Sequence, residues 1–215
     1  MMRPLFSVFS LILIVVCFSG AVSAAQPAPH RVLLVLGDSL SAGYGIAQGQ
    51  EWVTLLSQRF AREAQPVKVV NASISGETTS GGVARIKPLL ERETPAWVLI
   101  ELGGNDGLRG MSLVAMEANL QAMVDAVEES GAQPVLLGIK IPPNYGNKYR
   151  SRFEQVFVDV AERNDVALLP FLLDGVGGID NLMQADRIHP NQQAQPLIAD
   201  NVWEFLKPVM VKRDN

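Results

Sequence analysis

The sequence predicts an α/β domain in which a five-stranded parallel sheet lies between two layers of helices. Five short runs of consecutive apolar residues have the character of strands buried on both faces of a parallel sheet. They alternate with stretches in which apolar residues recur at helical spacing. Because each connection is long enough for a right-handed crossover, we expect a three-layer α/β/α sandwich.

The predicted strands are apolar runs followed by small or polar residues. They cover residues 32–36, 67–70, 97–102, 135–139 and 166–169. The predicted helices cover residues 51–64, 82–92, 112–130, 153–164 and 191–206. Ser112 can cap the third helix and Gly131 can end it, whereas Pro88 disturbs the middle of the second. Residues 142–146 and 175–180 are expected to be irregular.

Residues 1–24 have the three parts of a secretory signal peptide. Arg3 precedes an apolar run, residues 5–18, and small residues lead to a cleavage site after Ala24. The run is shorter than the roughly 20 residues that a membrane-spanning helix needs. We therefore expect a single mature domain, residues 25–215, that is periplasmic or secreted and has no stable membrane anchor.

Composition limits what the mature chain can bind. The only cysteine, Cys17, lies in the leader, which excludes an internal disulfide or a thiolate metal site. Removal of Arg3 leaves 17 of the 18 basic residues against 22 acidic ones, so the net charge moves from −4 to −5. No basic cluster is present to neutralise phosphates, which argues against nucleic acid. We expect a monomer without cofactor or metal.

Three predicted strands end in residues that can do chemistry. Ser39 follows the first strand, Gly76 lies in the loop after the second, and Asn105 follows the third. The carboxyl ends of parallel strands share one edge of the sheet, where open α/β sheets bind ligands. A serine nucleophile at this edge needs a base beside it.

Histidine is the obvious base, and the mature chain has two. His30 lies just before the first strand, so at about 3.3 Å per residue it should be roughly 20 Å or more from Ser39. His189 is therefore the candidate base, and Asp186, three residues upstream, can orient its ring and stabilise the imidazolium. Asp38 and Asp106 are expected to organise loops through backbone N–H groups.

At these residues the chain resembles the SGNH, or GDSL, hydrolase family. Four blocks match in order: Gly37-Asp38-Ser39-Leu40, then Gly76, then Gly103-Gly104-Asn105-Asp106, and finally Asp186 with His189-Pro190. Longer stretches are similar to the bacterial members that hydrolyse thioesters, lysophospholipids and aryl esters. Glu77 and Arg187 depart from the residues that close relatives often have, which are aspartate and glycine.

The resemblance implies a flavodoxin-like SGNH hydrolase fold and a serine esterase that forms an acyl-enzyme. It implies a triad of Ser39, Asp186 and His189. It also implies an oxyanion hole from the backbone N–H groups of Ser39 and Gly76 and the side chain of Asn105. The expected substrates are small esters or thioesters with an acyl chain, because apolar residues such as Leu108, Met111 and Ile141 follow the strands.

Two alternatives stay open at this point. A carbohydrate O-deacetylase would use the same groups on acetylated sugars. A periplasmic binding module or a nucleotide-binding α/β domain without chemistry would leave the serine unreactive. The absence of a Gly-rich phosphate loop argues against the nucleotide-binding version.

Overall fold

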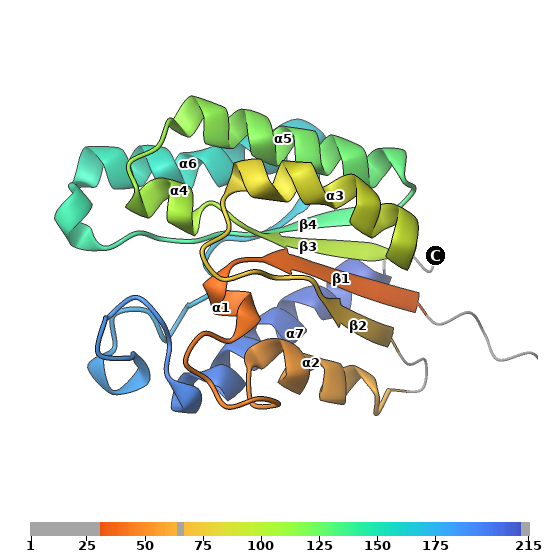
Figure 1. Cartoon of the computed structure of the whole chain (residues 1–215), viewed down its shortest axis with the longest axis horizontal. Helices are drawn as coiled ribbons and strands as arrows, with labels where there is room; N and C mark the ends of the chain where they lie inside the picture. Colours follow the sequence, from red (N-terminus) through yellow and green to blue (C-terminus); the bar gives the residue numbers. More distant parts are fainter. Residues whose placement is uncertain (1–30, 64–66, 212–215) are drawn as a thin grey trace, which may run out of the picture.

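A five-stranded parallel sheet forms the middle layer of the molecule (Figure 1). The computed structural model describes residues 31–63 and 67–211, so the predicted leader and His30 lie outside the described residues. The strands have the order β2-β1-β3-β4-β5, and every neighbouring pair is parallel. They are β1 (Arg31–Gly37), β2 (Val67–Asn71), β3 (Trp97–Glu101), β4 (Gln133–Leu137) and β5 (Ala167–Leu169). The predicted fold class is confirmed.

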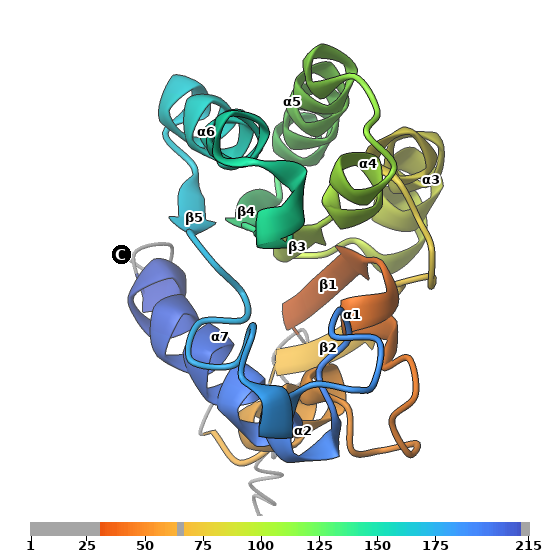
Figure 2. The same cartoon turned by 90° about the vertical axis from the view of Figure 1, so that its left-hand side faces the viewer.

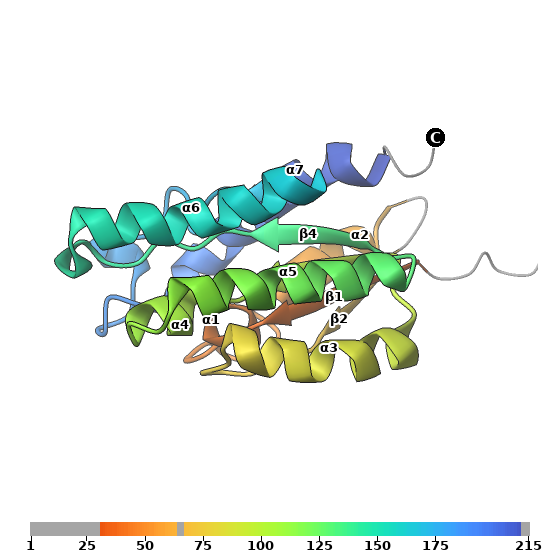
Figure 3. The same cartoon turned by 90° about the horizontal axis from the view of Figure 1, so that it is seen from above.

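Helices cover both faces of the sheet. The α-helices are α1 (Ser39–Ala42), α2 (Trp52–Phe60), α3 (Thr79–Glu93), α4 (Gly104–Leu108), α5 (Leu113–Glu129), α6 (Asn147–Asn164) and α7 (Gln195–Val211). Short 3-10 helices are η1 (Pro143–Tyr145), η2 (Asp180–Leu182) and η3 (Gln192–Ala194). Helices α3, α5 and α6 lie over one face, as Figure 3 shows from above, and α2 and α7 pack together on the other (Figure 2).

The central strands are apolar throughout because both of their faces are covered. Residues 33–36 of β1 are fully buried, and so is every residue of β3. On the α2 and α7 side, the rings of Phe60 and Trp203 meet edge to face with centroids 4.9 Å apart. Trp52 is fully buried in the same layer, as its helical spacing predicts. No helix within residues 31–63 and 67–211 has both the length and the apolar character needed to cross a membrane.

Several boundaries differ from the sequence prediction, each for a local reason. Helix α3 begins at Thr79 because the hydroxyl of Thr78 accepts a hydrogen bond from the N–H of Gly81, and the helix continues through Pro88. Helix α6 begins at Asn147, ahead of its apolar stripe. Its first turn is held by the Tyr149 hydroxyl, which donates to the Gly107 carbonyl.

The remaining differences are smaller. Strand β4 is shifted by two residues toward the N-terminus, and the residues after β3 form the short helix α4, which was not predicted. The closing helix is split, since η3 precedes α7, and α7 runs on to Val211. None of these changes moves the strand ends that carry the predicted site.

Candidate active site

Ser39 lies where β1 turns into the single-turn helix α1. The chain passes very close to β3 there: a Cβ atom on Gly37 would lie 2.7 Å from Oε2 of Glu101 and 2.8 Å from the side chain of Ser41. Only glycine fits this position. Asp38 then caps α1, because its Oδ1 accepts a hydrogen bond from the Leu40 N–H at 3.0 Å. The turn therefore presents Ser39 at the carboxyl edge of the sheet, which faces the viewer in Figure 2.

His189 lies on a loop that is closed on itself before α7. The N–H of Gln184 donates to the His189 carbonyl at 2.7 Å, and Met183 and Pro190 form an antiparallel bridge. The side-chain amide of Gln184 donates to the carbonyls of Pro190 and, across the site, Tyr44. These bonds fix the loop against the segment that follows α1.

The three predicted triad residues form one hydrogen-bonded chain. Nε2 of His189 is 2.9 Å from Oγ of Ser39, and its Nδ1 is 2.6 Å from Oδ2 of Asp186. The ring of Tyr44 packs against the imidazole with centroids 4.6 Å apart. Residues 150 positions apart in the sequence are therefore within proton-transfer distance.

Asp186 is arranged to remain ionised. Its Oδ1 accepts the backbone N–H groups of Ile188 and His189 at 2.9 and 3.0 Å. Burial alone would raise the pKa of Asp186, but hydrogen bonds from the backbone and ring of His189 and from Ile188 outweigh it and lower the pKa below its ordinary value. A carboxylate in this state holds the proton of the imidazole on Nδ1 and leaves Nε2 free to accept one.

The predicted oxyanion donors lie around the same serine. Within the described residues, the N–H groups of Ser39 and Gly76 have no hydrogen-bond partner. The Asn105 amide nitrogen donates to Oδ2 of Asp38 at 3.0 Å and to the carbonyl of Glu77 at 2.9 Å. Because this nitrogen carries two hydrogens, an oxyanion would have to share or displace one of these acceptors.

Two buried carboxyl groups lie beneath the serine. Oε2 of Glu101 accepts the Asp38 N–H at 3.2 Å and the Ser41 hydroxyl at 2.7 Å, whereas its Oε1 is buried without a partner in the described part of the chain. Burial, helped by the charge of Asp38, raises the pKa of Glu101 well above its ordinary value. Burial also raises the pKa of Asp38 to about 6, against the lowering effects of the Leu40 N–H, His189 and Asn105.

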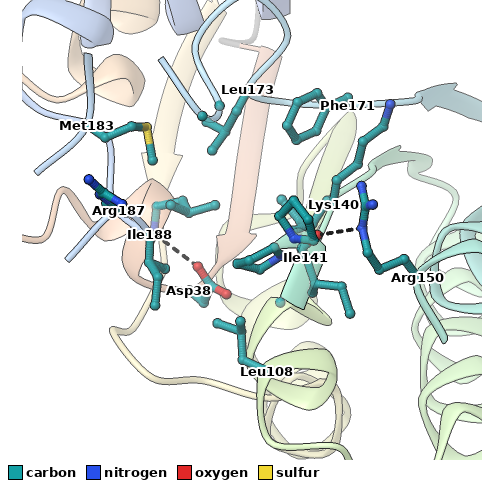
Figure 4. Close-up of a pocket in the computed structure, with 17 residues that line it drawn as sticks. Asp38, Leu108, Lys140, Ile141, Arg150, Phe171, Leu173, Met183, Arg187 and Ile188 are labelled. Atoms are coloured by element: carbon teal, nitrogen blue, oxygen red, sulfur yellow. Dashed lines mark hydrogen bonds between the residues drawn. The ribbon is translucent and has the colours of Figure 1, made fainter. Parts of the chain in front are cut away.

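An apolar cavity of about 330 Å³ begins beside the serine (Figure 4). Its lining includes Asp38 and Leu40, which flank Ser39, and Ile188, which precedes His189, whereas Ser39 and His189 themselves do not line it. Most of its lining residues are apolar, including Leu108 and Ile141 as expected from the sequence. Met111, expected with them, does not line the cavity and is 42% exposed.

Two further acidic side chains near the site, those of Asp106 and Glu77, make structural contacts. Asp106 organises a loop as predicted, because its carboxylate accepts the N–H and the hydroxyl of Thr79 at 2.9 and 2.6 Å. Glu77 pairs with Arg85 at 2.8 Å. No cluster of histidine, cysteine and acidic side chains that could hold a metal ion occurs in residues 31–63 and 67–211.

Sequence reasoning missed Glu101 and the charged part of the cavity wall. Glu101 is the penultimate residue of the predicted strand 97–102, and its only signal is a carboxylate that interrupts an apolar run two residues before Gly103-Gly104-Asn105-Asp106. The cavity wall draws on segments far apart in the sequence, so no local pattern marks it.

The chain is similar to known hydrolases over most of its length. Residues 35–196 match the model of the GDSL-like lipase/acylhydrolase family. Esterase TesA of Pseudomonas aeruginosa is 51% identical over 86% of this chain and 92% of its own. The thioesterase 1/protease 1/lysophospholipase L1 of Escherichia coli K12 is 43% identical over 86% of this chain and 88% of its own.

A solved structure gives the same result in three dimensions. The psychrotrophic esterase EstA of a Pseudoalteromonas species, in a crystal structure inhibited by monoethylphosphonate, superposes with a TM-score of 0.80 at 42% sequence identity. The match covers 84% of this chain and 98% of that one.

Proposed function

The chain belongs to the GDSL-like lipase/acylhydrolase family and is a serine esterase, and we propose that it hydrolyses esters and thioesters through an acyl-enzyme on Ser39. The observation that carries this assignment is the continuous chain of contacts from Asp186 through His189 to Ser39, at 2.6 and 2.9 Å. It is the arrangement that activates a weak hydroxyl nucleophile.

The reaction has two halves that use the same groups. The Ser39 oxygen attacks the substrate carbonyl while Nε2 of His189 takes its proton, and Asp186 stabilises the imidazolium. The tetrahedral intermediate collapses, the carbonyl–leaving-group bond breaks, and His189 returns the proton to the departing alcohol or thiol. A water molecule then attacks the acyl-enzyme with His189 again as base, which releases the acid and restores Ser39.

The developing negative charge needs donors that are in place before reaction. We assign this role to the N–H groups of Ser39 and Gly76 and to the Asn105 amide. The first two are supported by their unused N–H groups. Asn105 can contribute by transferring one N–H from its contact with Asp38 or Glu77 to the oxyanion. Each such donor typically contributes about 100- to 1,000-fold in turnover.

We place the acyl chain of the substrate in the apolar cavity, since burial of methylene groups there is favourable by about 0.8 kcal/mol each. The name of the Escherichia coli relative points to thioesters and lysophospholipids, and we extend the proposed substrates to acyl-CoA and to aryl and acyl esters. The leader-like residues 1–24 support a mature enzyme, residues 25–215, in the periplasm or outside the cell, and we propose that it acts as a monomer.

The assignment is tested with Ser39→Ala, with Ser57→Ala as a control for the same chemical change on α2. The mature proteins are labelled with a fluorophosphonate and assayed on p-nitrophenyl butyrate, an acyl-CoA, a lysophospholipid and an acetylated sugar. We expect labelling and hydrolysis in wild type and Ser57→Ala, and a loss of at least about 10³-fold in folded Ser39→Ala. Near-normal turnover by Ser39→Ala would refute the assignment. Exclusive use of the acetylated sugar would favour an O-deacetylase.

A further inference from the structure

One part of the cavity wall is basic. Three cationic residues, Lys140, Arg150 and Arg187, line the cavity together with a single carboxyl group, that of Asp38. Asp38 is buried and already accepts hydrogen bonds from Leu40 and Asn105. It is therefore not available to neutralise the cations, and the apolar cavity carries an excess of positive charge.

Lys140 and Arg150 are held in defined positions. Nζ of Lys140 lies 5.0 Å from the centroid of the Phe171 ring, and Nε of Arg150 donates to the carbonyl of Ile141 at 3.1 Å. The second contact anchors the guanidinium beside the backbone of the residue that follows Lys140. Figure 4 shows both side chains on the part of the wall away from Arg187. The planar guanidinium of Arg150, fixed in this way, loses little conformational freedom when it binds an anion.

Neither cation is used in an ion pair. Within the described ranges, no carboxylate lies within salt-bridge distance of Lys140 or Arg150, although Arg59, Arg85 and Arg163 each have such a partner. The Arg150 guanidinium directs one N–H to Ile141 and keeps its Nη groups free of any hydrogen bond to the described residues. Two like charges without a counterion, next to apolar surface, favour an anionic group from outside the chain.

We propose that Lys140 and Arg150 form an anion subsite, so that the preferred substrates are esters whose cavity-bound part ends in a carboxylate or phosphate. The inference rests on the proposed function, because it places the uncharged segment of the substrate between the reacting carbonyl at Ser39 and these cations. The anion lies at the far end of the acyl chain where that chain occupies the cavity, as placed above, or on the alcohol in esters whose alcohol occupies the cavity instead.

Matched substrate pairs separate charge from shape and identify which half carries the anion. For the acyl half, p-nitrophenyl esters of ω-carboxy acids in a series of increasing chain length are compared with the neutral ω-carboxamides of equal length, because the series finds the length at which the anion reaches the cations. For the alcohol half, octanoyl glycerol 3-phosphate is compared with octanoyl glycerol. The quantity measured is the ratio of kcat/KM for the anionic over the neutral member of each pair.

We expect this ratio in the wild type to exceed one for at least one pair and to fall about fivefold to thirtyfold in Lys140→Met with Arg150→Met. It should also fall with added NaCl, because both cations reach solvent. Lys87→Met, which removes an exposed charge from α3 outside the cavity, should leave the ratio unchanged. Circular dichroism and thermal melting check that the variants are folded.

The outcomes distinguish this inference from the function on which it rests. Hydrolysis of the neutral esters with a ratio that is the same in wild type and double variant would overturn the anion subsite and leave the esterase assignment intact. An equal fall in Lys87→Met would also overturn it, because it would show a non-specific effect of net charge. Failure of wild type on every ester would refute the proposed function itself.

Discussion

Asp186→Asn provides a sharp test of how the triad is oriented. The carboxylate of Asp186 accepts three hydrogen bonds, two at Oδ1 from the N–H groups of Ile188 and His189 and one at Oδ2 from the imidazole. Asparagine has a single acceptor oxygen. We expect this oxygen to face the two backbone N–H groups, which leaves the NH2 group directed at Nδ1. The imidazole must then carry its proton on Nε2, where it cannot accept one from Ser39.

The size of the effect follows from the contacts. If the amide of the Asp186→Asn variant turned its oxygen toward Nδ1 to restore the correct tautomer, its NH2 group would face the backbone N–H groups of Ile188 and His189. Both backbone hydrogen bonds would be lost, at a cost of about 2–4 kcal/mol. That corresponds to roughly 30- to 1,000-fold in rate, since about 1.36 kcal/mol is one factor of ten. Loss of the negative charge beside the imidazolium adds to it, so we expect kcat to fall by about 10³- to 10⁴-fold.

The tautomer can be observed directly as well as through turnover. A His30→Ala background leaves His189 as the only histidine of the mature chain, so its ¹⁵N shifts can be assigned without ambiguity. We expect the neutral ring to be protonated on Nδ1 where Asp186 is intact and on Nε2 in the Asp186→Asn variant. A variant whose ring stays protonated on Nδ1, or whose kcat falls less than about tenfold, would refute the reasoning.

Three further predictions follow from single contacts. Burial raises the pKa of Asp38 from the ordinary 3.8 to about 6, so the folded state binds more protons than the unfolded state between these pH values. The contribution of Asp38 to the free energy of unfolding should therefore fall by up to about 3 kcal/mol as pH rises through this window. Urea denaturation should show this fall, and an Asp38→Asn variant with the same pH profile would contradict it. Gly138→Ala would place a Cβ atom 2.5 Å from the Pro170 carbonyl oxygen and should lower the free energy of unfolding by about 1–3 kcal/mol, whereas an unchanged urea midpoint would show that the backbone gives way freely. Asn105→Ala should lower kcat by about 100- to 1,000-fold and affect KM less, and a change confined to KM would exclude it from the oxyanion hole.

The layers of the fold could be predicted from the sequence because the signal is local. A strand such as β1 is buried on both faces, so its apolar residues are consecutive in the sequence. In an amphipathic helix such as α2, the apolar residues recur in the sequence at the spacing of one helical turn. Boundaries were missed where tertiary contacts decide them. Residues 147–152 are mostly polar and give no helical stripe, yet the Tyr149 hydroxyl bonds to α4 and the helix begins there. The strand order likewise depends on contacts between distant segments.

The juxtaposition of Ser39 and His189 was predictable because the mature chain has few alternatives. With two histidines and the rule that parallel strands end at one edge, elimination is enough. The surroundings were not predictable in the same way. Glu101 acquires its environment only when β3 passes under the turn at Gly37, and the amide of Asn105 is committed to Asp38 and Glu77 only in the folded molecule.

The order in which the chain supplies its reactive groups affects when activity can begin. Ser39 follows β1, Asn105 follows β3, and His189 comes only just before α7. A nascent polypeptide therefore exposes its hydroxyl long before the imidazole has been synthesised, and remains inert through most of translation. If the chain is divided into two fragments at a point after α6 and before Asp186, each fragment alone should be inactive. Turnover that appears when the fragments are mixed would then show that they have reassembled.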